Sequence, residues 1–306
     1  MLAAVVARQL FRPLFEGPAI SRWSTVFVAI CVQAMPFLVL GVVISGLVSA
    51  FATPERLRRV LPKNAALSVP VGAIGGAVLP GCECSSVPVA ARLTERGVPL
   101  PTALAFLLAS PAINPVVLIS TAVAFPNRPA VVLARFVASA LAATIVGLIW
   151  LRMGSDEWLS PRWRDLASRP VERGNWRQAS AAALHDFSHA GGYLVFGAMA
   201  AATLQTVIPR SSLDSLGANP IVAVLALALL AVVLSICSEA DAFVATSLTS
   251  FSLSSRLTFL VVGPMVDLKL IALQSGTFGP QFARRFAPLT LVVAILTSSL
   301  IGAVLL

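Results

Sequence analysis

Charged residues are scarce in this chain. Of its 306 residues, only 11% are Asp, Glu, Lys or Arg, whereas 58% are hydrophobic. Soluble domains carry about 25% charged residues, and a soluble core of this size has no room for so much apolar surface. Apolar runs of about 20 residues recur along the chain, which is typical of membrane-spanning helices rather than of a barrel. We therefore predict an all-α, polytopic helical membrane protein.

Several motifs are missing as well. The sequence holds no Walker A or other nucleotide-binding motif, so coupling to ATP would need a partner, and we predict no enzymatic activity and no resident cofactor. The net charge is +9, but no basic block is interleaved with aromatic residues, which argues against nucleic-acid binding. Four cysteines in apolar context do not indicate a disulfide framework, and Cys31 is interpreted as a small core residue.

Two polar motifs interrupt the apolar background. Residues 81–86 read Gly-Cys-Glu-Cys-Ser-Ser, and residues 235–241 read Ser-Ile-Cys-Ser-Glu-Ala-Asp. A proline-containing break follows each motif at the same distance: Pro111 lies 27 residues after Cys84, and Pro264 lies 27 residues after Cys237. This equal spacing predicts an internal repeat whose two copies contribute to one site.

The repeat divides the chain into four parts. These are an N-terminal interfacial segment (residues 1–22), a first transmembrane repeat (23–151), a basic cytoplasmic linker (152–182) and a second transmembrane repeat (183–306). We expect ten crossings if the short apolar pieces cross the membrane, and eight if residues 82–93 are re-entrant. An odd number of crossings per half makes the halves antiparallel, as in the inverted repeats of secondary transporters. The positive-inside rule then places the linker in the cytoplasm and the N-terminus outside.

The polar residues of both copies are the candidate site. Thiols and carboxylates at membrane depth are rare and usually functional. Thiolates select soft cations, and carboxylates add charge and suit harder ones. We expect the substrate site to be lined by Cys82, Glu83, Cys84, Asn114, Cys237, Glu239, Asp241 and Asp267. Within this set, the predicted metal ligands are Cys82, Cys84, Cys237 and Glu239, and a bound metal ion would be the substrate.

Broken helices are expected around the site. Side chains two residues apart on a helix diverge by about 200°, so Cys82 and Cys84 can face one ion only where the backbone is unwound. Transporters with inverted repeats bind substrate at such breaks near the midplane. The predicted structural breaks are Pro80, Gly81, Pro88, Pro111, Pro115, Gly263 and Pro264.

These motifs resemble those of a known family. Residues 80–88, 92–97 and 110–115 are similar to the DUF318 (UPF0718) permease family, which includes YraQ-type and organoarsenical efflux permeases, and residues 237–241 and 262–269 fit its second half. The resemblance covers residues 25–306 and implies a multi-pass permease of the bacterial inner membrane. Members usually show Cys-x-Cys-Gly, whereas Ser85 takes the Gly position here. A divalent or soft metal is therefore a more natural expectation than an organoarsenical.

Three functions are consistent with the sequence. The first is a secondary-type permease for a thiophilic metal, metalloid or metal complex. The second is a membrane thiol- or sulfur-handling redox protein, and the third is a non-transporting scaffold subunit. Carboxylates beside the thiols favour transport. The expected partners are membrane lipid, a small inorganic or thiophilic substrate, and a periplasmic or membrane partner protein.

Overall fold

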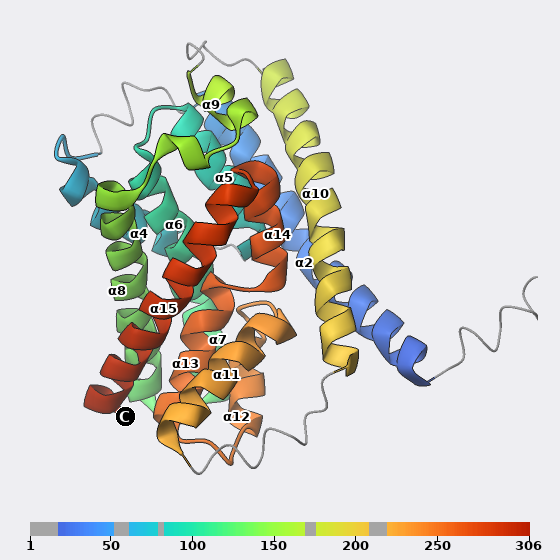
Figure 1. Cartoon of the computed structure of the whole chain (residues 1–306), viewed down its shortest axis with the longest axis vertical. Coiled ribbons are helices and arrows are strands. Elements are labelled where there is room, and N and C mark those ends of the chain that lie inside the picture. Colours follow the sequence, from blue (N-terminus) through green and yellow to red (C-terminus); the bar gives the residue numbers. More distant parts are fainter. Residues whose placement is uncertain (1–17, 52–60, 79–82, 169–175, 208–218) are drawn as a thin grey trace, which may run out of the picture.

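The computed structural model describes residues 18–51, 61–78, 83–168, 176–207 and 219–306 (Figure 1). Its described part is helical and contains no strand. The first half holds α2 (Pro18–Phe51), α4 (Ala65–Val78), α5 (Glu83–Glu95), α6 (Leu100–Ile113), α7 (Pro115–Ala124) and α8 (Pro129–Met153). A 3-10 turn η1 (Asp156–Trp158) and α9 (Pro161–Ser168) follow. The second half holds α10 (Trp176–Val207), α11 (Pro220–Leu234), α12 (Asp241–Ser247), α13 (Leu253–Met265), α14 (Leu268–Thr277) and α15 (Pro280–Leu305).

Five segments among the described residues are long and apolar enough to cross a membrane. They are Ile20–Val48, Leu100–Ala124, Pro129–Met153, Leu253–Thr277 and Pro280–Leu305. A sixth long helix, α10, has 32 residues. It runs antiparallel to α2, as two hydrogen bonds show: Trp23 near the start of α2 donates to Thr203 near the end of α10, and Ser45 near the end of α2 donates to Asp186 in the first half of α10. The chain is therefore an all-α polytopic membrane protein, as the sequence predicted.

The short helices α4 and α5 form a pair that returns to its starting level. α4 runs parallel to α6. Gly72 packs against the Thr102 carbonyl oxygen, and one turn later in both helices Gly76 packs against the Phe106 carbonyl oxygen, so closely that a Cβ at Gly76 would lie 2.7 Å from it. α5 ends at Glu95, and four residues separate it from the start of α6 at Leu100. The start of α4 and the end of α5 therefore both lie level with the start of α6.

The short helices α11 and α12 form the corresponding pair from the other side. A Cβ at Gly263, near the end of α13, would lie 3.9 Å from both Ala231 of α11 and Asp241 of α12. α12 then ends close to the beginning of α13, and Figure 1 shows α11 and α12 at the end of the molecule opposite to α5 and α9. The prediction of ten crossings counted all of these short helices as crossings, whereas the alternative of eight treated residues 82–93 as re-entrant, which agrees with the returning path of α5.

Two of the long apolar segments are broken in the middle. The first breaks at Asn114, whose side chain accepts from the Val117 N–H at 3.0 Å and so caps α7. The second breaks at Asp267, whose side chain accepts from the Leu270 N–H at 2.6 Å and caps α14. These side chains satisfy helix N–H groups that have no partner within the helix.

The predicted breaks fall close to these points, with one correction. Pro115 begins α7, whereas Pro111, Gly263 and Pro264 lie in the last turns of α6 and α13, just before the chain unwinds. Pro88 lies inside α5, as its sixth residue, and does not end it. Pro80 and Gly81 lie outside the described residues.

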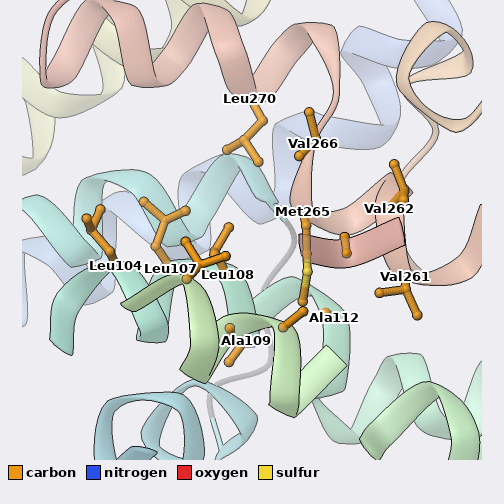
Figure 2. Packing of buried hydrophobic residues seen from close by; sticks show 14 of the residues in the cluster. Leu104, Leu107, Leu108, Ala109, Ala112, Val261, Val262, Met265, Val266 and Leu270 are labelled. Atoms are coloured by element: carbon orange, nitrogen blue, oxygen red, sulfur yellow. The ribbon is translucent and has the colours of Figure 1, made fainter. Parts of the chain in front are cut away.

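The two broken segments meet in the core. Figure 2 shows Leu104, Leu108 and Ala112 of α6 together with Val262 and Met265 of α13, and the Met265 side chain extends toward Ala112. All of these side chains are buried. An apolar wall therefore joins the halves beside the two breaks and limits water around the polar groups there.

Candidate functional site

Four short helices begin at the centre of the molecule with a polar residue. Glu83 is the first residue of α5 and Asp241 is the first residue of α12, while Asn114 and Asp267 cap α7 and α14. α5 packs on α14, and α7 packs on α12. An acidic group at a helix N-terminus is stabilised by the helix dipole, which explains how the fold retains three buried acids in an apolar setting.

The first ionic group joins the two halves through Lys269. Its ammonium donates to Oε1 of Glu83 at 2.7 Å and lies 3.5 Å from Oδ2 of Asp267. All three side chains are almost completely buried. Glu83 comes from α5 of the first half, whereas the other two belong to the second half, so this group depends on both.

The second ionic group joins the halves in the opposite sense. Arg135 of α8 donates from both terminal nitrogens to Asp241 of α12, at 2.9 Å and 2.7 Å. The same guanidinium also donates to the Thr121 hydroxyl and to the Ser238 carbonyl oxygen. A bidentate pair of this kind is geometrically rigid, which indicates that Arg135 clamps the second motif against α7 and α8.

The second motif lies in an unwound stretch between α11 and α12. Ser235 ends α11 in the left-handed region, with φ of 46°, and its hydroxyl accepts from the Leu268 N–H at the start of α14. Cys237 is buried, and Glu239 follows in the turn. Both Glu239 carboxylate oxygens are buried and lack a hydrogen-bond partner among the described residues. Unwound backbone was also expected at the first motif; there Cys84 lies in the first described turn of α5, and Cys82 lies outside the described residues.

Two buried thiols lie near the first ionic group. Cys84 and Cys237 are both buried, and both are within electrostatic range of the Lys269 ammonium. Cys82 lies outside the described residues, so its predicted role stays a prediction. Among the described residues, no group of three His, Cys, Asp or Glu side chains is arranged to hold a metal ion. The predicted thiol–carboxylate metal site is therefore not assembled by these residues in this conformation.

Negative charge exceeds positive charge in this central cluster, which we define as Glu83, Arg135, Glu239, Asp241, Asp267 and Lys269. The interactions of Glu239 and Asp241 extend to Glu83 and Arg135, which makes the six side chains one electrostatic unit. Four carboxylates face two cations among these described residues, an excess of two when all are ionised. Oε2 of Glu83 also has no hydrogen-bond partner in the described part.

Arg135 and Lys269 were not predicted as site residues. The signal that could have identified them is their position, because each is a cation within an otherwise apolar helix and such cations need a buried partner. Their partners lie 106 and 186 residues away in sequence. Spacing along the chain therefore gave no indication of the pairing.

Two glycines allow the long helices to approach the cluster. A Cβ at Gly197 of α10 would lie 2.6 Å from the Lys269 Cα, and a Cβ at Gly41 of α2 would overlap the backbone of Ser85. Only a residue without a side chain permits such contact between helices. The antiparallel pair α2 and α10 therefore holds the first turns of α5 and α14 in place.

A cavity lies at the other ends of α5 and α14. It has a volume of about 180 Å³ and is lined by Pro88, Ala91, Arg92, Glu95, Ser160, Trp163, His185, Asp186, His189, Ala190, Gly276 and Thr277. Arg92 bridges Asp186 of α10, at 2.6 Å and 3.0 Å, and Glu95, at 2.7 Å. We name this space the linker-side cavity because Ser160 and Trp163 of the linker help to form it.

A second cavity lies at the opposite ends of α7 and α12. It has a volume of about 340 Å³, and its lining includes Phe125, Arg128, Thr246 and Arg256. Each pair of short helices therefore runs from the central cluster to a cavity: α5 with α14 to one side, and α7 with α12 to the other.

Comparison with known proteins identifies the family. The ArsP_1 family model, described as a predicted permease, matches residues 20–303. The UPF0718 protein YcgR of Bacillus subtilis (strain 168) is 37% identical over 291 residues, covering 91% of this chain and 96% of the relative. A Streptococcus mutans (serotype c) protein named as a two-component membrane permease complex subunit is 34% identical over 287 residues, covering 90% of this chain and 94% of the relative.

No solved structure shows significant similarity to the chain. The sequence resemblance to UPF0718 permeases is confirmed by both the family model and the named relatives. With its long apolar helices, the chain is a multi-pass bacterial membrane protein. It belongs to the ArsP_1 family of predicted permeases.

Proposed function

We propose that this chain is a secondary-type permease that carries a thiophilic metal, metalloid or metal complex as a cationic species. The observation that carries this proposal is the pair of buried, unpartnered Glu239 oxygens in a cluster of four carboxyl groups and two cationic side chains. A charge at membrane depth is costly unless it is neutralised. A cation bound beside Glu239 offsets the excess and gives its oxygens a partner.

The two thiols favour a soft cation over a hard one. Cys84 and Cys237 come from different halves and lie near the same ammonium. Thiolate ligands select soft metals such as Cu(I), and Zn²⁺ also accepts mixed sulfur and oxygen ligands. Since the described side chains do not form a ready metal site, binding requires the cluster to rearrange.

The arrangement of the halves supports alternating access. α6 and α13 begin 153 residues apart, and the same distance separates Asn114 and Asp267, which cap the helices that follow them, α7 and α14. The short pairs α4–α5 and α11–α12 enter from opposite ends, as an inverted repeat requires. In this proposal, the linker-side cavity and the cavity at Arg256 are the two approaches to the cluster.

A partner protein is part of the proposal. One relative is named as a subunit of a two-component membrane permease complex, and this chain carries no nucleotide-binding motif. We therefore expect the second component to deliver or accept the cation rather than to supply ATP hydrolysis through this chain.

The test is uptake of Zn²⁺, Cd²⁺, Cu(I) and As(III) into proteoliposomes that contain the purified chain. We expect one of these species to enter faster than into empty vesicles, and we expect Glu239→Gln and Cys237→Ser to abolish the difference. Glu157→Gln is the matched carboxylate control, because Glu157 is exposed in the 3-10 turn η1, away from the cluster and from both cavities. Transport that survives in both Glu239→Gln and Cys237→Ser contradicts the proposal.

A further inference from the structure

Lys269 occupies a position that suits a cation. Its ammonium lies between two carboxylates, from different halves, at 2.7 Å and 3.5 Å. The side chain is 1% exposed, and both thiols are within electrostatic range. These are the oxygen and sulfur donors that the proposed substrate would use.

We propose that Lys269 is a tethered competitor of the substrate: its ammonium holds Glu83 while the site is empty, and the incoming cation takes Glu83 as the ammonium moves to Asp267. This inference rests on the proposed function and identifies the residue that regulates its site. The ammonium stays charged throughout, and no proton is transferred.

The acceptor for the displaced ammonium is already present. Oδ2 of Asp267 is 3.5 Å from Nζ of Lys269 and accepts no hydrogen bond from the described residues. Its other oxygen, Oδ1, is held by the Leu270 N–H. A shift of the flexible lysine side chain therefore converts the long contact into a hydrogen bond, and it frees Oε1 of Glu83.

Only the side chain of Lys269 is able to make this shift. The backbone of α10 at Gly197 packs directly against the Lys269 Cα, so closely that a Cβ at Gly197 would lie 2.6 Å from it, and this contact holds the Cα in place. The Glu83–Lys269 bond joins α5 to α14, whose far ends line the linker-side cavity. When a mobile cation replaces the ammonium, the Glu83–Lys269 bond between the two halves is therefore lost.

Arg135 offers a contrast within the same cluster. It donates to three different groups and holds Asp241 through both of its terminal nitrogens. Lys269 makes a single short contact with its carboxylate partner Glu83. A multidentate guanidinium is harder to displace than an ammonium that acts as a point charge, so we assign the mobile role to Lys269 and the clamp to Arg135.

The test is equilibrium binding of Cd²⁺ to the purified full chain and to Lys269→Gln and Lys269→Arg. A competitor lowers the apparent affinity for the substrate in proportion to the fraction of sites that it leaves open. Lys269→Gln removes the competitor and is therefore expected to bind Cd²⁺ at least about tenfold more tightly than the wild-type chain. Lys269→Arg is expected to bind about tenfold more weakly, because a guanidinium holds Glu83 more firmly.

A merely structural lysine would not produce opposite effects in these two variants. Unchanged or weaker Cd²⁺ binding by folded Lys269→Gln overturns the inference and leaves the proposed function standing. If that variant does not fold, unchanged affinity in Lys269→Arg overturns it equally. Failure of the wild-type chain to bind Cd²⁺, Zn²⁺, Cu(I) or As(III) overturns the proposed function, and the inference with it.

Discussion

At the scale of single residues, the two helix caps differ in charge although they share a role. Asn114 and Asp267 each accept from the N–H group three residues later. An amide therefore suffices for capping, since asparagine and aspartate are about equally good caps. The carboxylate at position 267 is needed for a different reason, which we attribute to its contact with Lys269.

Replacing Asp267 separates these two roles. Asp267→Asn keeps the cap and is expected to retain the fold while weakening cation binding. Asp267→Ala also loses the cap, which costs about 1 kcal/mol. Thermal unfolding in detergent and Cd²⁺ titration of both variants check this. Wild-type Cd²⁺ affinity in folded Asp267→Asn would show that the charge has no role in the site.

The Arg135–Asp241 pair is expected to contribute chiefly to stability. Removing one partner of a buried ion pair leaves an uncompensated charge and costs about 3 to 5 kcal/mol. Arg135→Gln should therefore lower the unfolding temperature strongly, and the double variant Arg135→Gln/Asp241→Asn should recover part of the loss. Unfolding monitored by circular dichroism measures this. A double variant as unstable as the sum of the two single ones would contradict direct pairing.

At the scale of elements, the packing of α10 on α14 depends on Gly197. Gly197→Val introduces overlap with the Lys269 backbone and is expected to cost about 1 to 3 kcal/mol, with loss of cation binding. Gly192 is the control on the same helix, because a Cβ there meets nothing within 4 Å. Gly192→Ala should be neutral or slightly stabilising. Equal unfolding temperatures for the two variants would show that the close approach is unimportant.

Several elements could be predicted from the sequence. The breaks near Asn114 and Asp267 were expected because proline and polar residues interrupt two apolar runs at equal distances from a cysteine. The returning paths of α4–α5 and α11–α12 were not resolved, because hydropathy reports the length of an apolar segment and not its direction. The partners of Glu83 and Asp241 were missed for a related reason. They are set by packing between halves, which leaves no periodic pattern along the chain.

At the scale of the whole molecule, the proposed inverted repeat predicts the sides of two exposed turns. Glu157 lies in the segment 152–182, which is predicted from its arginines to be cytoplasmic, and Ser250 lies between α12 and α13 at the opposite end. A membrane-impermeant maleimide should label Ser250→Cys in intact cells, whereas Glu157→Cys should react only after lysis. The unmodified chain supplies the background. Labelling of both positions from one side would contradict the proposed arrangement of the halves.

The central claim is that both halves build one cation site. It is tested most directly by the stoichiometry of metal bound to the purified chain, measured by elemental analysis after titration with Zn²⁺, Cd²⁺, Cu(I) or As(III). We predict one bound ion per chain for a soft species, lost in Cys84→Ser of the first half and equally in Glu239→Gln of the second. No binding by the folded wild-type chain, or full binding in both variants, would contradict the claim.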